Sequence, residues 1–513
     1  MKTYEKYKKT NQIWLNLLPE HWENIKLRQI LRPFSEKNHP ELQLLSVVRE
    51  KGVIIRNTEN KEENHNFIPE DLSGYKRVKQ GQFVINKMKA WQGSYGVSKY
   101  DGIVSPAYFV FDFNQDFNPD FFNYAIRSKI YVSFFGSASD GIRVGQWDLS
   151  MQKMKEIPFL LPPRAEQDQI VRFLDWKVSC INKLIKIKKK QIVFLGDLKK
   201  AVITQAVTKG IGKTPSVSLS AASSATRSHP VARLHAAILG DSPTAKLGEH
   251  PIVSSTKNFP QEVGGSGFGE AKDDRGLINE QLKYSGIQWI GKTPNHWLIT
   301  KLKRITNIRK QKGLYKPNKK DKYIGLENIQ SYSNCFFETN TVYEESNQAI
   351  CREGDIVFGK LRPYLAKVLK VPFNAFCTSE LLIFSKFNGD MDFLRYALLN
   401  EKFIDTVNES TYGAKMPRAN ADYILNLEIA IPPLEEQKEI VSYLDKNCKK
   451  IDLETQKIES IIKTLKALKT RLISDVVTGK IDVRDIEIPE YEFVAEEQTE
   501  SSADTEQIEE RED

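Results

Sequence analysis

Residues 161–184, LPPRAEQDQIVRFLDWKVSCINKL, return at residues 431–454 as IPPLEEQKEIVSYLDKNCKKIDLE. The two copies align without a gap at a constant offset of 270 residues (432 − 162 = 270), and the match continues as far as Val207-Thr208 and Val477-Thr478. Two unrelated surface helices would not share such a register. The repeat therefore indicates that the chain contains two halves built on one plan.

Each copy has the pattern of one long helix. A Pro pair stands where helices begin, Glu166 or Glu436 follows in the first turn, and no Pro then interrupts roughly 40 residues. Apolar residues recur every three or four positions, which is typical of a narrow coiled-coil seam. At about 1.5 Å per residue, each helix would be roughly 60 Å long. A helix with such a seam needs a partner, and the other copy supplies one.

The repeat extends beyond the helices. IWLNLLPEHWENIKLRQI (from Ile13) and QWIGKTPNHWLITKLKRI (from Gln288) share a Trp, a Pro and a His-Trp pair, whose tryptophans we expect to be core anchors. Between this opening and the helix, each half has short runs rich in Val, Ile, Phe and Tyr, which predict strands. Short helices are expected near residues 121–128 and 391–400. Each half is thus predicted to be an α+β globule that leads into one long helix.

Composition limits the class of protein. A chain of 513 residues is long enough for two or three domains with cores of their own. No apolar run approaches membrane-spanning length and the N-terminus has no apolar signal core, so we expect no membrane partner. The five cysteines lack CxxC spacing, which indicates neither a disulfide framework nor a zinc site. These features favour a reducing, cytoplasmic location.

The net charge of +9 is unevenly distributed along the chain. From Ile486 onward there are twelve acidic residues and one Arg511, a net charge of −11, so residues 1–485 carry about +20 (9 + 11). An acidic tail of this kind is typically disordered. The positive body favours a polyanionic partner such as DNA, although charge alone is a weak signal.

The duplicated plan resembles the specificity subunit of type I restriction–modification systems, over residues 10–211 and 280–485. The resemblance rests on two diverged α+β domains, each followed by a helix of pattern [IL]PP-x-x-EQ-x-x-IV-x-[FY]LD. It implies two target-recognition domains held apart by an antiparallel pair of long helices with a pseudo-twofold internal repeat. The motif residues expected to form the scaffold and dock partner subunits are Pro162, Pro163, Glu166, Gln167, Leu174, Asp175, Pro432, Pro433, Glu436, Gln437, Leu444 and Asp445.

The same resemblance implies a domain order and a set of partners. The expected order is target-recognition domain 1 (1–160), spacer helix 1 (161–212), a Ser/Ala/Gly-rich linker or insertion (213–279), target-recognition domain 2 (280–430), spacer helix 2 (431–485) and an acidic, disordered tail (486–513). The linker is longer than the short join usual in the family. The implied partners are double-stranded DNA, two modification (methyltransferase) subunits and restriction (motor-nuclease) subunits. S-adenosylmethionine, ATP and magnesium would belong to those subunits, and this chain would be non-catalytic, without a cofactor or metal.

Paired helices with a basic globule at each end would act as a ruler between two DNA readers. Readers on one face of B-DNA should be spaced by about a helical turn, roughly 34 Å. Because the two globules differ in sequence, each should read different bases. We therefore expect a bipartite, asymmetric target with an unread spacer.

The candidate DNA-contacting residues are polar or aromatic side chains on loops. Arg and Lys can contact guanine, and Asn and Gln adenine, but the same cations also bind phosphates, and the sequence leaves both roles open. The candidates are Lys87, Lys89, Trp91, Gln92, Arg143 and Gln146 in the first half, and Lys360, Arg362, Tyr364, Lys415, Arg418 and Asn420 in the second.

Motifs that would indicate an enzyme are weak or missing in the sequence. Residues 286–293 fit GxxxxGK[ST], but Pro294 follows at once, bulky residues fill the loop and no clear strand precedes it, so we do not expect a phosphate-binding loop. No HExxH, GxSxG, [DN]PP[YF] or GxGxxG occurs. The alternative to a DNA reader is a coiled-coil scaffold whose globules bind protein. Steep salt dependence of binding would favour DNA.

Overall fold

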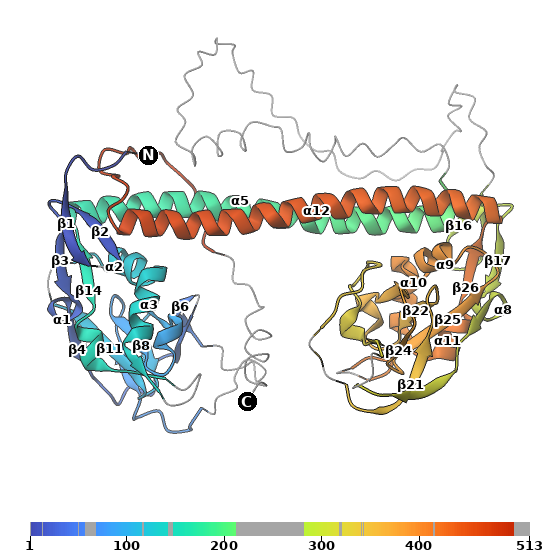
Figure 1. The fold of residues 1–513 in the computed structure, drawn as a ribbon, viewed down its shortest axis with the longest axis horizontal. Coiled ribbons are helices and arrows are strands. Elements are labelled where there is room, and N and C mark those ends of the chain that lie inside the picture. Colours follow the sequence, from blue (N-terminus) through green and yellow to red (C-terminus); the bar gives the residue numbers. More distant parts are fainter. Residues whose placement is uncertain are drawn as a thin grey trace, which may run out of the picture. The chain divides into compact units, whose positions relative to one another are not determined.

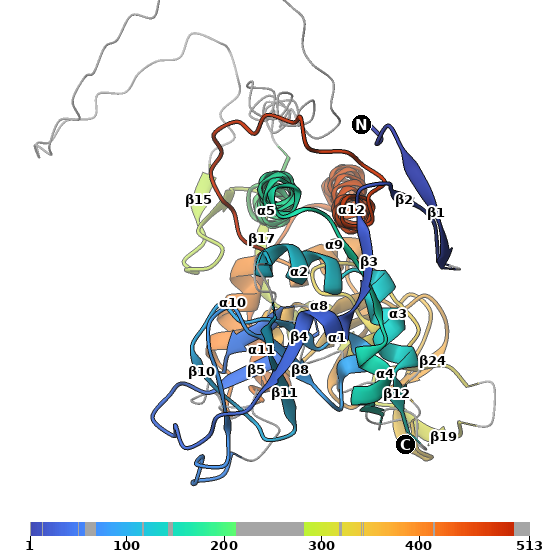
Figure 2. The same ribbon diagram turned by 90° about the vertical axis from the view of Figure 1, so that its left-hand side faces the viewer.

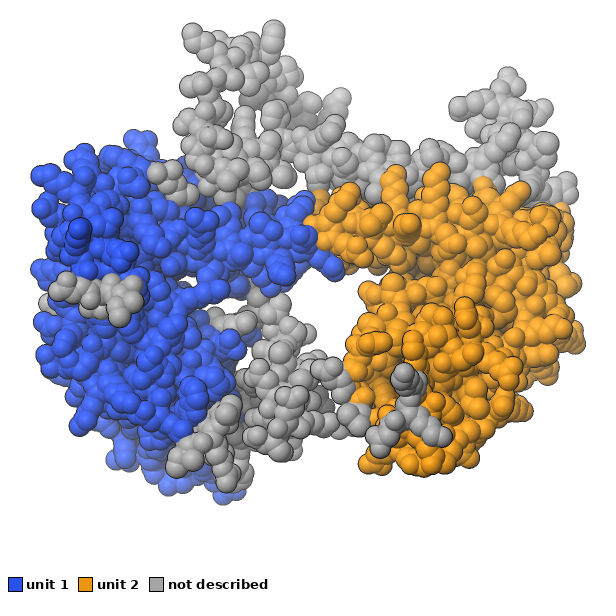
Figure 3. All heavy atoms as spheres, viewed as in Figure 1, with its two compact units in different colours: residues 1–189, 228–244, 459–513 blue, residues 190–227, 245–458 orange. Residues whose placement is uncertain are grey.

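The computed structural model describes residues 2–12, 14–49, 51–56, 68–114, 117–141, 147–211, 282–317, 321–339, 341, 343–413 and 416–496. Its contacts divide the chain into two units (Figure 3). Unit 1 comprises residues 1–189, 228–244 and 459–513, and unit 2 comprises residues 190–227 and 245–458. We call residues 2–161 head 1 and residues 282–431 head 2, and describe each unit by itself.

Head 1 is built around a four-stranded antiparallel sheet with the order β4-β11-β8-β9 (Figure 1). These strands are β4 (Leu31–Phe34), β8 (Phe83–Asn86), β9 (Tyr95–Val97) and β11 (Tyr108–Phe113). One face packs against α2 (Pro119–Ile126) and α3 (Lys129–Ser137) through buried aromatic side chains. Alternating apolar residues predicted β8 and β11, and the helix expected near residues 121–128 is α2.

Smaller strand pairs complete head 1. An antiparallel pair near the start of the chain precedes a short turn of helix, and two further pairs pack on the second face of the sheet around Val47, Val78 and Val104. The elements are β1 (Tyr7–Gln12) with β2 (Leu15–Pro19), β5 (Leu45–Val48) with β6 (Gly52–Ile55), β7 (Lys76–Val78) with β10 (Gly102–Val104), β12 (Ser139–Asp140) with β13 (Asp148–Leu149), α1 (Leu27–Ile30), η1 (Ala90–Gln92) and α4 (Met151–Lys155).

Head 2 repeats the central sheet of head 1. The order β18-β25-β22-β23 is again antiparallel throughout, and α9 (Met391–Leu398) and α10 (Glu401–Glu409) take the places of α2 and α3. The strands are β18 (Thr306–Ile308), β22 (Ile356–Gly359), β23 (Val368–Lys370) and β25 (Leu381–Phe387). The shared strand order confirms that the repeat covers the heads as well as the helices.

A second four-stranded sheet distinguishes head 2 from head 1. It has the order β19-β21-β24-β20 and packs around Ile324, Leu369 and Cys377. The remaining elements of head 2 are β15 (Leu282–Tyr284), β16 (Lys292–Pro294), α8 (Leu302–Ile305), β19 (Lys312–Tyr315), β20 (Tyr323–Ile324), η2 (Leu326–Asn328), β21 (Ser346–Cys351), η3 (Pro363–Leu365), β24 (Ala375–Cys377) and α11 (Ala421–Asn426).

Each head is closed by a strand pair that joins its last strand to the strand that follows its opening strand pair. In head 1, β3 (Glu23–Lys26) pairs antiparallel with β14 (Pro158–Leu161), and in head 2, β17 (Leu298–Lys301) pairs antiparallel with β26 (Glu428–Ile431). The closing strands β14 and β26 lead directly into the Pro pairs, after which α5 (Arg164–Lys209) and α12 (Leu434–Val477) begin. The two long helices predicted from the repeat are therefore present.

Within each unit, part of α5 lies beside part of α12 and runs in the opposite direction (Figures 1 and 2). In unit 1, the start of α5 and Gly479, two residues after the end of α12, both adjoin Trp22. Lys469 Nζ lies 3.4 Å from Asn182 Oδ1. In unit 2, Lys199 Nζ lies 2.7 Å from Asp452 Oδ1. Ile170, Leu174 and Ile181 share one core with Leu472 and Val476, as Ile203 and Val207 do with Ile440 and Leu444. The structure therefore confirms the α+β fold with antiparallel long helices.

The chain after α12 turns back along α5 in unit 1. Gln169 Nε2 donates to the carbonyl oxygens of Val483 and Ile486, at 3.1 and 2.8 Å. Ser179 Oγ donates to Glu492 O at 2.9 Å and accepts from Val494 N at 2.7 Å. Residues 486–496 therefore differ from the disordered tail expected from composition, because their backbone polar groups and apolar residues find partners on α5. Residues 497–513 lie outside the described part of the chain.

Candidate nucleic-acid interface and helix joints

In both halves, the head contacts the start of its long helix through equivalent residues. We call this contact the joint. At the joint of unit 1, Glu166 is buried and accepts three hydrogen bonds. Its Oε1 accepts from Trp22 Nε1 at 3.0 Å and from the Tyr4 hydroxyl at 2.6 Å, and its Oε2 lies 2.7 Å from His21 Nε2. Burial and the adjacent Glu166 carboxylate raise the pKa of Tyr4, so the phenol keeps the proton that it donates.

The joint of unit 2 has the same geometry with one contact fewer. Glu436 Oε1 accepts from Trp297 Nε1 at 3.0 Å, and its Oε2 lies 2.8 Å from His296 Nε2. The expectation that Trp22 and Trp297 anchor the core is confirmed, since both indoles are buried. The repeated His-Trp pair and the repeated Glu are therefore the two sides of one contact in each half.

The residue after each glutamate ties the helix start to the head. Gln167 Nε2 donates to Pro162 O at 2.9 Å, while its Oε1 accepts from Asn118 N at 3.0 Å. Gln437 does the same with Pro432 O at 2.8 Å and Asp390 N at 2.8 Å. Each glutamine thus holds the turn before its helix and the N-terminus of α2 or α9 together.

The remaining motif residues divide into buried and outward-facing positions. Leu174 and Leu444 are fully buried in the helix seam. Asp175 Oδ1 accepts from the Tyr124 hydroxyl at 2.7 Å, and Asp445 Oδ1 accepts from the Tyr396 hydroxyl, also at 2.7 Å. Burial raises the pKa of Asp175. Pro163 and Pro433 are exposed, whereas Pro162 and Pro432 are buried. The motif therefore builds the joints themselves, and docking of partner subunits on it stays a prediction.

In head 1, the two loops that carry candidate DNA contacts come together. Leu149 N donates to Lys87 O at 3.1 Å, and Lys87 Nζ pairs with Asp148 Oδ2 at 2.5 Å. The ring of Trp91 packs against that of Trp147 at 5.1 Å between centroids, and Trp91 Nε1 is buried without a described hydrogen-bond partner. Lys89 is exposed at the start of η1 and Gln92 is half-buried at its end.

In head 2, the corresponding loops meet in the same way. Ala419 N donates to Lys360 O at 2.9 Å, and Arg362 N donates to Pro417 O at 2.7 Å. Arg418 Nε pairs with Glu380 Oε2 at 2.9 Å. Burial lowers the pKa of Lys360. The equivalent backbone bonds, Leu149 to Lys87 and Ala419 to Lys360, show that the loop pair is a feature of the shared fold.

Three candidate residues of head 2 have distinct surroundings. Tyr364 is exposed on η3, which gives its ring access to a ligand. Arg362 has a positive φ of 49°, an unusual backbone conformation for a non-glycine residue. Asn420 caps α11 by accepting from Asp422 N at 2.8 Å, so its carbonyl oxygen has a structural role already. The predicted contacts of Arg143, Gln146 and Lys415 lie outside the described residues.

The sequence did not single out several residues at these loops. Trp147 and Asp148 pack against Trp91 and Lys87, Glu380 pairs with Arg418, and Tyr412 is exposed beside Arg418 through paired backbone hydrogen bonds. Trp147 and Tyr412 flank the glycine-containing loops, which is the only signal that could have pointed to them. The acidic partners are separated by many residues from the cations that they contact, so no local pattern marks them.

Other expected features can be compared with the described residues. Lys292-Thr293-Pro294 form strand β16 rather than the start of a helix, so the GxxxxGK[ST] match lacks the phosphate-binding geometry. Within the described ranges, no group of three or more His, Cys, Asp or Glu is placed to hold a metal. No helix in this part of the chain is both long and apolar enough to cross a membrane.

The sequence of the chain also matches a known protein family in both halves. A model of the type I restriction modification DNA specificity domain matches residues 19–194 and again residues 294–463. The chain belongs to this family. The two matched segments contain the two Glu joints and both loop pairs, so the specificity domain occurs here twice.

Two proteins that are similar in sequence to this chain are specificity subunits of type I restriction enzymes. The chain is 24% identical over 376 residues to the type I restriction enzyme MjaVIII specificity subunit of Methanocaldococcus jannaschii, a match that spans 70% of this chain and 69% of the relative. It is 23% identical over 194 residues to the type I restriction enzyme EcoDI specificity subunit of Escherichia coli, covering 37% of this chain and 43% of the relative.

A solved structure shows the same fold as this specificity-domain chain. It comes from work on complex assembly and conformational transition of the type I R-M system, and it matches with a TM-score of 0.57 at 13% identity. The match covers 90% of this chain and 99% of that one. At this identity the likeness concerns the fold alone.

Proposed function

We propose that this chain reads DNA as the specificity subunit of a type I restriction–modification complex. The observation that carries the proposal is the loop pair in each head, where Lys87 and Lys360 are fixed by equivalent backbone hydrogen bonds beside an aromatic residue and further cations. Such loops can reach base edges while neighbouring Lys and Arg hold phosphates. The family and its relatives support the same role.

The proposed target is bipartite and asymmetric. Each head has a central sheet with the same strand order, but the residues on the loops differ. Head 1 presents Lys89 and Gln92, and head 2 presents Arg362 and Tyr364. Different side chains present different hydrogen-bonding groups, so each head reads its own half-site. The two half-sites are separated by an unread spacer, and the long helices hold the readers at a set distance.

Catalysis belongs, in this proposal, to partner subunits. The chain scaffolds two methyltransferase subunits and the restriction subunits, which carry S-adenosylmethionine, ATP and magnesium. Support comes from the family alone, because the relatives are specificity subunits of type I restriction enzymes. Incubating the purified chain alone with DNA and S-adenosylmethionine is expected to transfer no methyl groups, whereas the reconstituted complex is expected to do so.

The experiment that tests the target is methylome sequencing of cells that carry the chain with its partner subunits. Two different short half-sites around a fixed spacer are expected, and one continuous site or a perfect palindrome would contradict the proposal. In vitro, Lys89→Ala or Arg362→Ala should weaken binding to the identified duplex by about 1–3 kcal/mol if the side chain contacts a base. The control is Lys303→Ala, an exposed cation on α8 outside the loops.

Salt dependence separates this proposal from a protein-binding scaffold. Phosphate contacts release counterions, so the binding constant for DNA should fall steeply as salt rises. Binding to DNA that is independent of salt, or no binding in the presence of the partner subunits, would favour the scaffold instead.

A further inference from the structure

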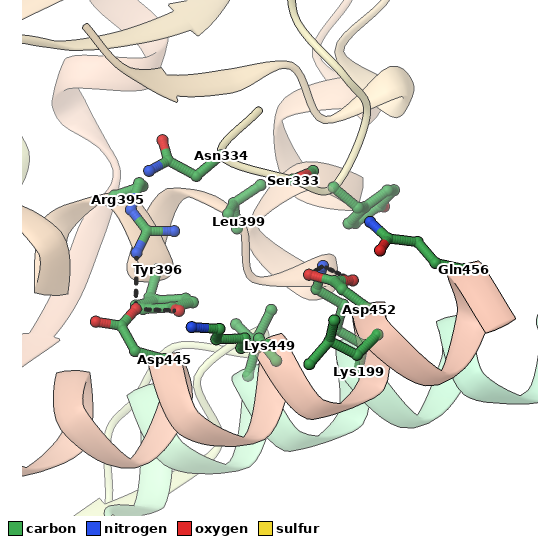
Figure 4. A pocket seen from close by; sticks show the side chains of 14 residues that line it. Lys199, Ser333, Asn334, Arg395, Tyr396, Leu399, Asp445, Lys449, Asp452 and Gln456 are labelled. Carbon is green, nitrogen blue, oxygen red and sulfur yellow. Dashed lines mark hydrogen bonds and ion pairs between the residues drawn. The ribbon is translucent and has the colours of Figure 1, made fainter. Parts of the chain in front are cut away.

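Unit 2 contains a cleft between its head and its helix pair (Figure 4). The cleft has a volume of about 430 Å³ and is lined by the loop at Tyr332–Asn334, by α9 and by the facing sides of α12 and α5. Leu399 and Tyr332 supply apolar surface, and Lys449 and Gln456 supply polar groups. Of the motif and loop residues described above, only Asp445 and its partner Tyr396 line this cleft; the Glu436 contacts and the loop pair of head 2 do not.

The repeat relates the cleft to an occupied place in unit 1. At the offset of 270 residues, the lining residues Lys449, Asp452, Leu453 and Lys199 correspond to Ser179, Asn182, Lys183 and Lys469. All four counterparts in unit 1 hold the tail segment that ends at Glu496. The open cleft of unit 2 is therefore the equivalent of a site that, in unit 1, contains an extended polypeptide.

The contacts in unit 1 show what such a site recognises. Ser179 and Asn182 bond the backbone of the segment, the latter through Nδ2 to Val494 O at 3.1 Å. Lys183 Nζ pairs with Glu492 at 2.9 Å, and Lys469 Nζ pairs with Glu496 at 2.6 Å. Recognition thus combines an extended backbone with carboxylate side chains.

The charge of the cleft in unit 2 suits a segment of the same kind. Lys449 replaces Ser179 at the point where the segment passes, and within the described part of the chain its ammonium group has no ion-pair partner. Lys199 Nζ pairs with Asp452, and Arg395 pairs with Asp445 at 3.3 Å. Leu453, 49% exposed, adds an apolar contact where unit 1 has Lys183.

The sequence just after α5 is not acidic at the positions that match the tail. At the offset of 270, Glu492 and Glu496 of the tail correspond to Ala222 and Thr226, and residues 213–226 contain no acidic or aromatic residue. The part of the chain that follows α5 at the matching distance therefore offers no carboxylate to Lys449, in contrast to the segment after α12.

We propose that the cleft of unit 2 is a docking site for an extended, acidic segment of another protein, bound as unit 1 binds its own tail. The site is separate from the loops proposed to read DNA, and its test does not depend on them.

The probe is a fluorescein-labelled peptide with the sequence of residues 486–496, IEIPEYEFVAE, titrated with the full chain and followed by fluorescence anisotropy. Saturable binding is expected. Lys449→Glu should weaken it by about tenfold or more, because an attractive charge-assisted contact becomes a repulsive one. Lys450→Glu is the matched control, since Lys450 is exposed on the same helix but does not line the cleft, and it should change affinity by less than about twofold.

Two further arms make the result decisive. A peptide in which the four glutamates are replaced by Gln should bind at least about tenfold more weakly. Ser179→Ala, which loosens the tail in unit 1, should leave affinity for the added peptide unchanged. Absence of binding would overturn the proposal. Binding that is insensitive to Lys449→Glu, or that rises in Ser179→Ala, would also overturn it, because the peptide would then lie elsewhere or in unit 1. Circular dichroism of each variant checks that the helices are intact.

Discussion

Replacing the glutamate at each joint should destabilise unit 1 more than unit 2. Glu166→Ala leaves two buried donors without an acceptor, Trp22 Nε1 and the Tyr4 hydroxyl, whereas His21 is partly exposed and can turn to water. An unpaired buried donor costs about 1–3 kcal/mol, so the expected loss of unfolding free energy is about 2–6 kcal/mol. Glu436→Ala leaves only the indole N–H of Trp297 without an acceptor, so the expected loss of unfolding free energy is about 1–3 kcal/mol.

Hydrogen–deuterium exchange followed by mass spectrometry can measure the two effects separately, because each unit has its own peptides at the joint. Protection should fall in peptides that contain Trp22 and the start of α5 in Glu166→Ala, and in peptides around Trp297 and the start of α12 in Glu436→Ala. Global denaturation alone would not suffice, because a chain with two units need not unfold in one step.

A double-mutant cycle tests the cause. Trp22→Phe removes the indole N–H but keeps an aromatic ring, so combining it with Glu166→Ala should give a coupling of about 1 kcal/mol or more. Equal losses in the two units, or no coupling between Glu166 and Trp22, would refute the reasoning that the buried hydrogen bonds make the joint.

Three other predictions follow from single features. Gly479 has a φ of +71° and an added Cβ would lie 2.6 Å from Pro19 Cδ, so Gly479→Ala should lower the unfolding free energy of unit 1 by about 2 kcal/mol or more, measured by hydrogen–deuterium exchange in peptides of unit 1. Hydrogen bonds from Arg77 and Lys79 lower the pKa of Glu36 from 4.5 to about 2; this stabilisation should be complete above about pH 4.5 and disappear as pH falls through 2, so the stability difference between the native chain and Glu36→Gln should shrink in acid. Ser179→Ala removes two hydrogen bonds to the tail, and limited proteolysis should then cut near Phe493 faster than in the native chain, with equal rates counting against a bound tail.

Much of the fold could be predicted because local sequence patterns indicate its helices and strands, and because these patterns occur in both halves of the chain. The long helices followed from Pro at the start, an uninterrupted run and a three-to-four-residue apolar period. The central strands β8 and β22 followed from alternating apolar residues, and their equivalence from the constant offset. A pattern that occurs twice in one chain reduces the chance of a false match, which is why even the head-to-helix order could be stated.

The joints show what a single sequence leaves out. Glu166 and Trp22 are 144 residues apart, and nothing local states that they touch. The only sign of the contact in the sequence is that both residues recur in the second half, as Glu436 and Trp297. The sequence alone predicts a core anchor and a separate helix motif, because the contact between them depends on how the head folds back onto its helix.

The tail illustrates a different limit. Its acidic composition is typical of disorder, yet Ile486 and Ile488 pack against the core of unit 1 and Glu492 pairs with Lys183. Composition averages over the segment, whereas burial depends on a few apolar positions and on a complementary surface that becomes apparent only in three dimensions. The second sheet of head 2 was likewise not expected, although the β7–β10 pair of head 1 corresponds to its β21–β24 pair.

The strand pairs β3–β14 and β17–β26 have a consequence for how such chains diversify. The part of head 1 from β3 to β14, and the part of head 2 from β17 to β26, each begin and end side by side, so this part of a head is joined to the rest of its unit at one place. A gene segment encoding a different reader, provided that it begins and ends with strands that can form this pair, could be exchanged by recombination without altering the helix that follows. New target sequences could therefore arise by cassette replacement, with the old joint keeping the new head in place.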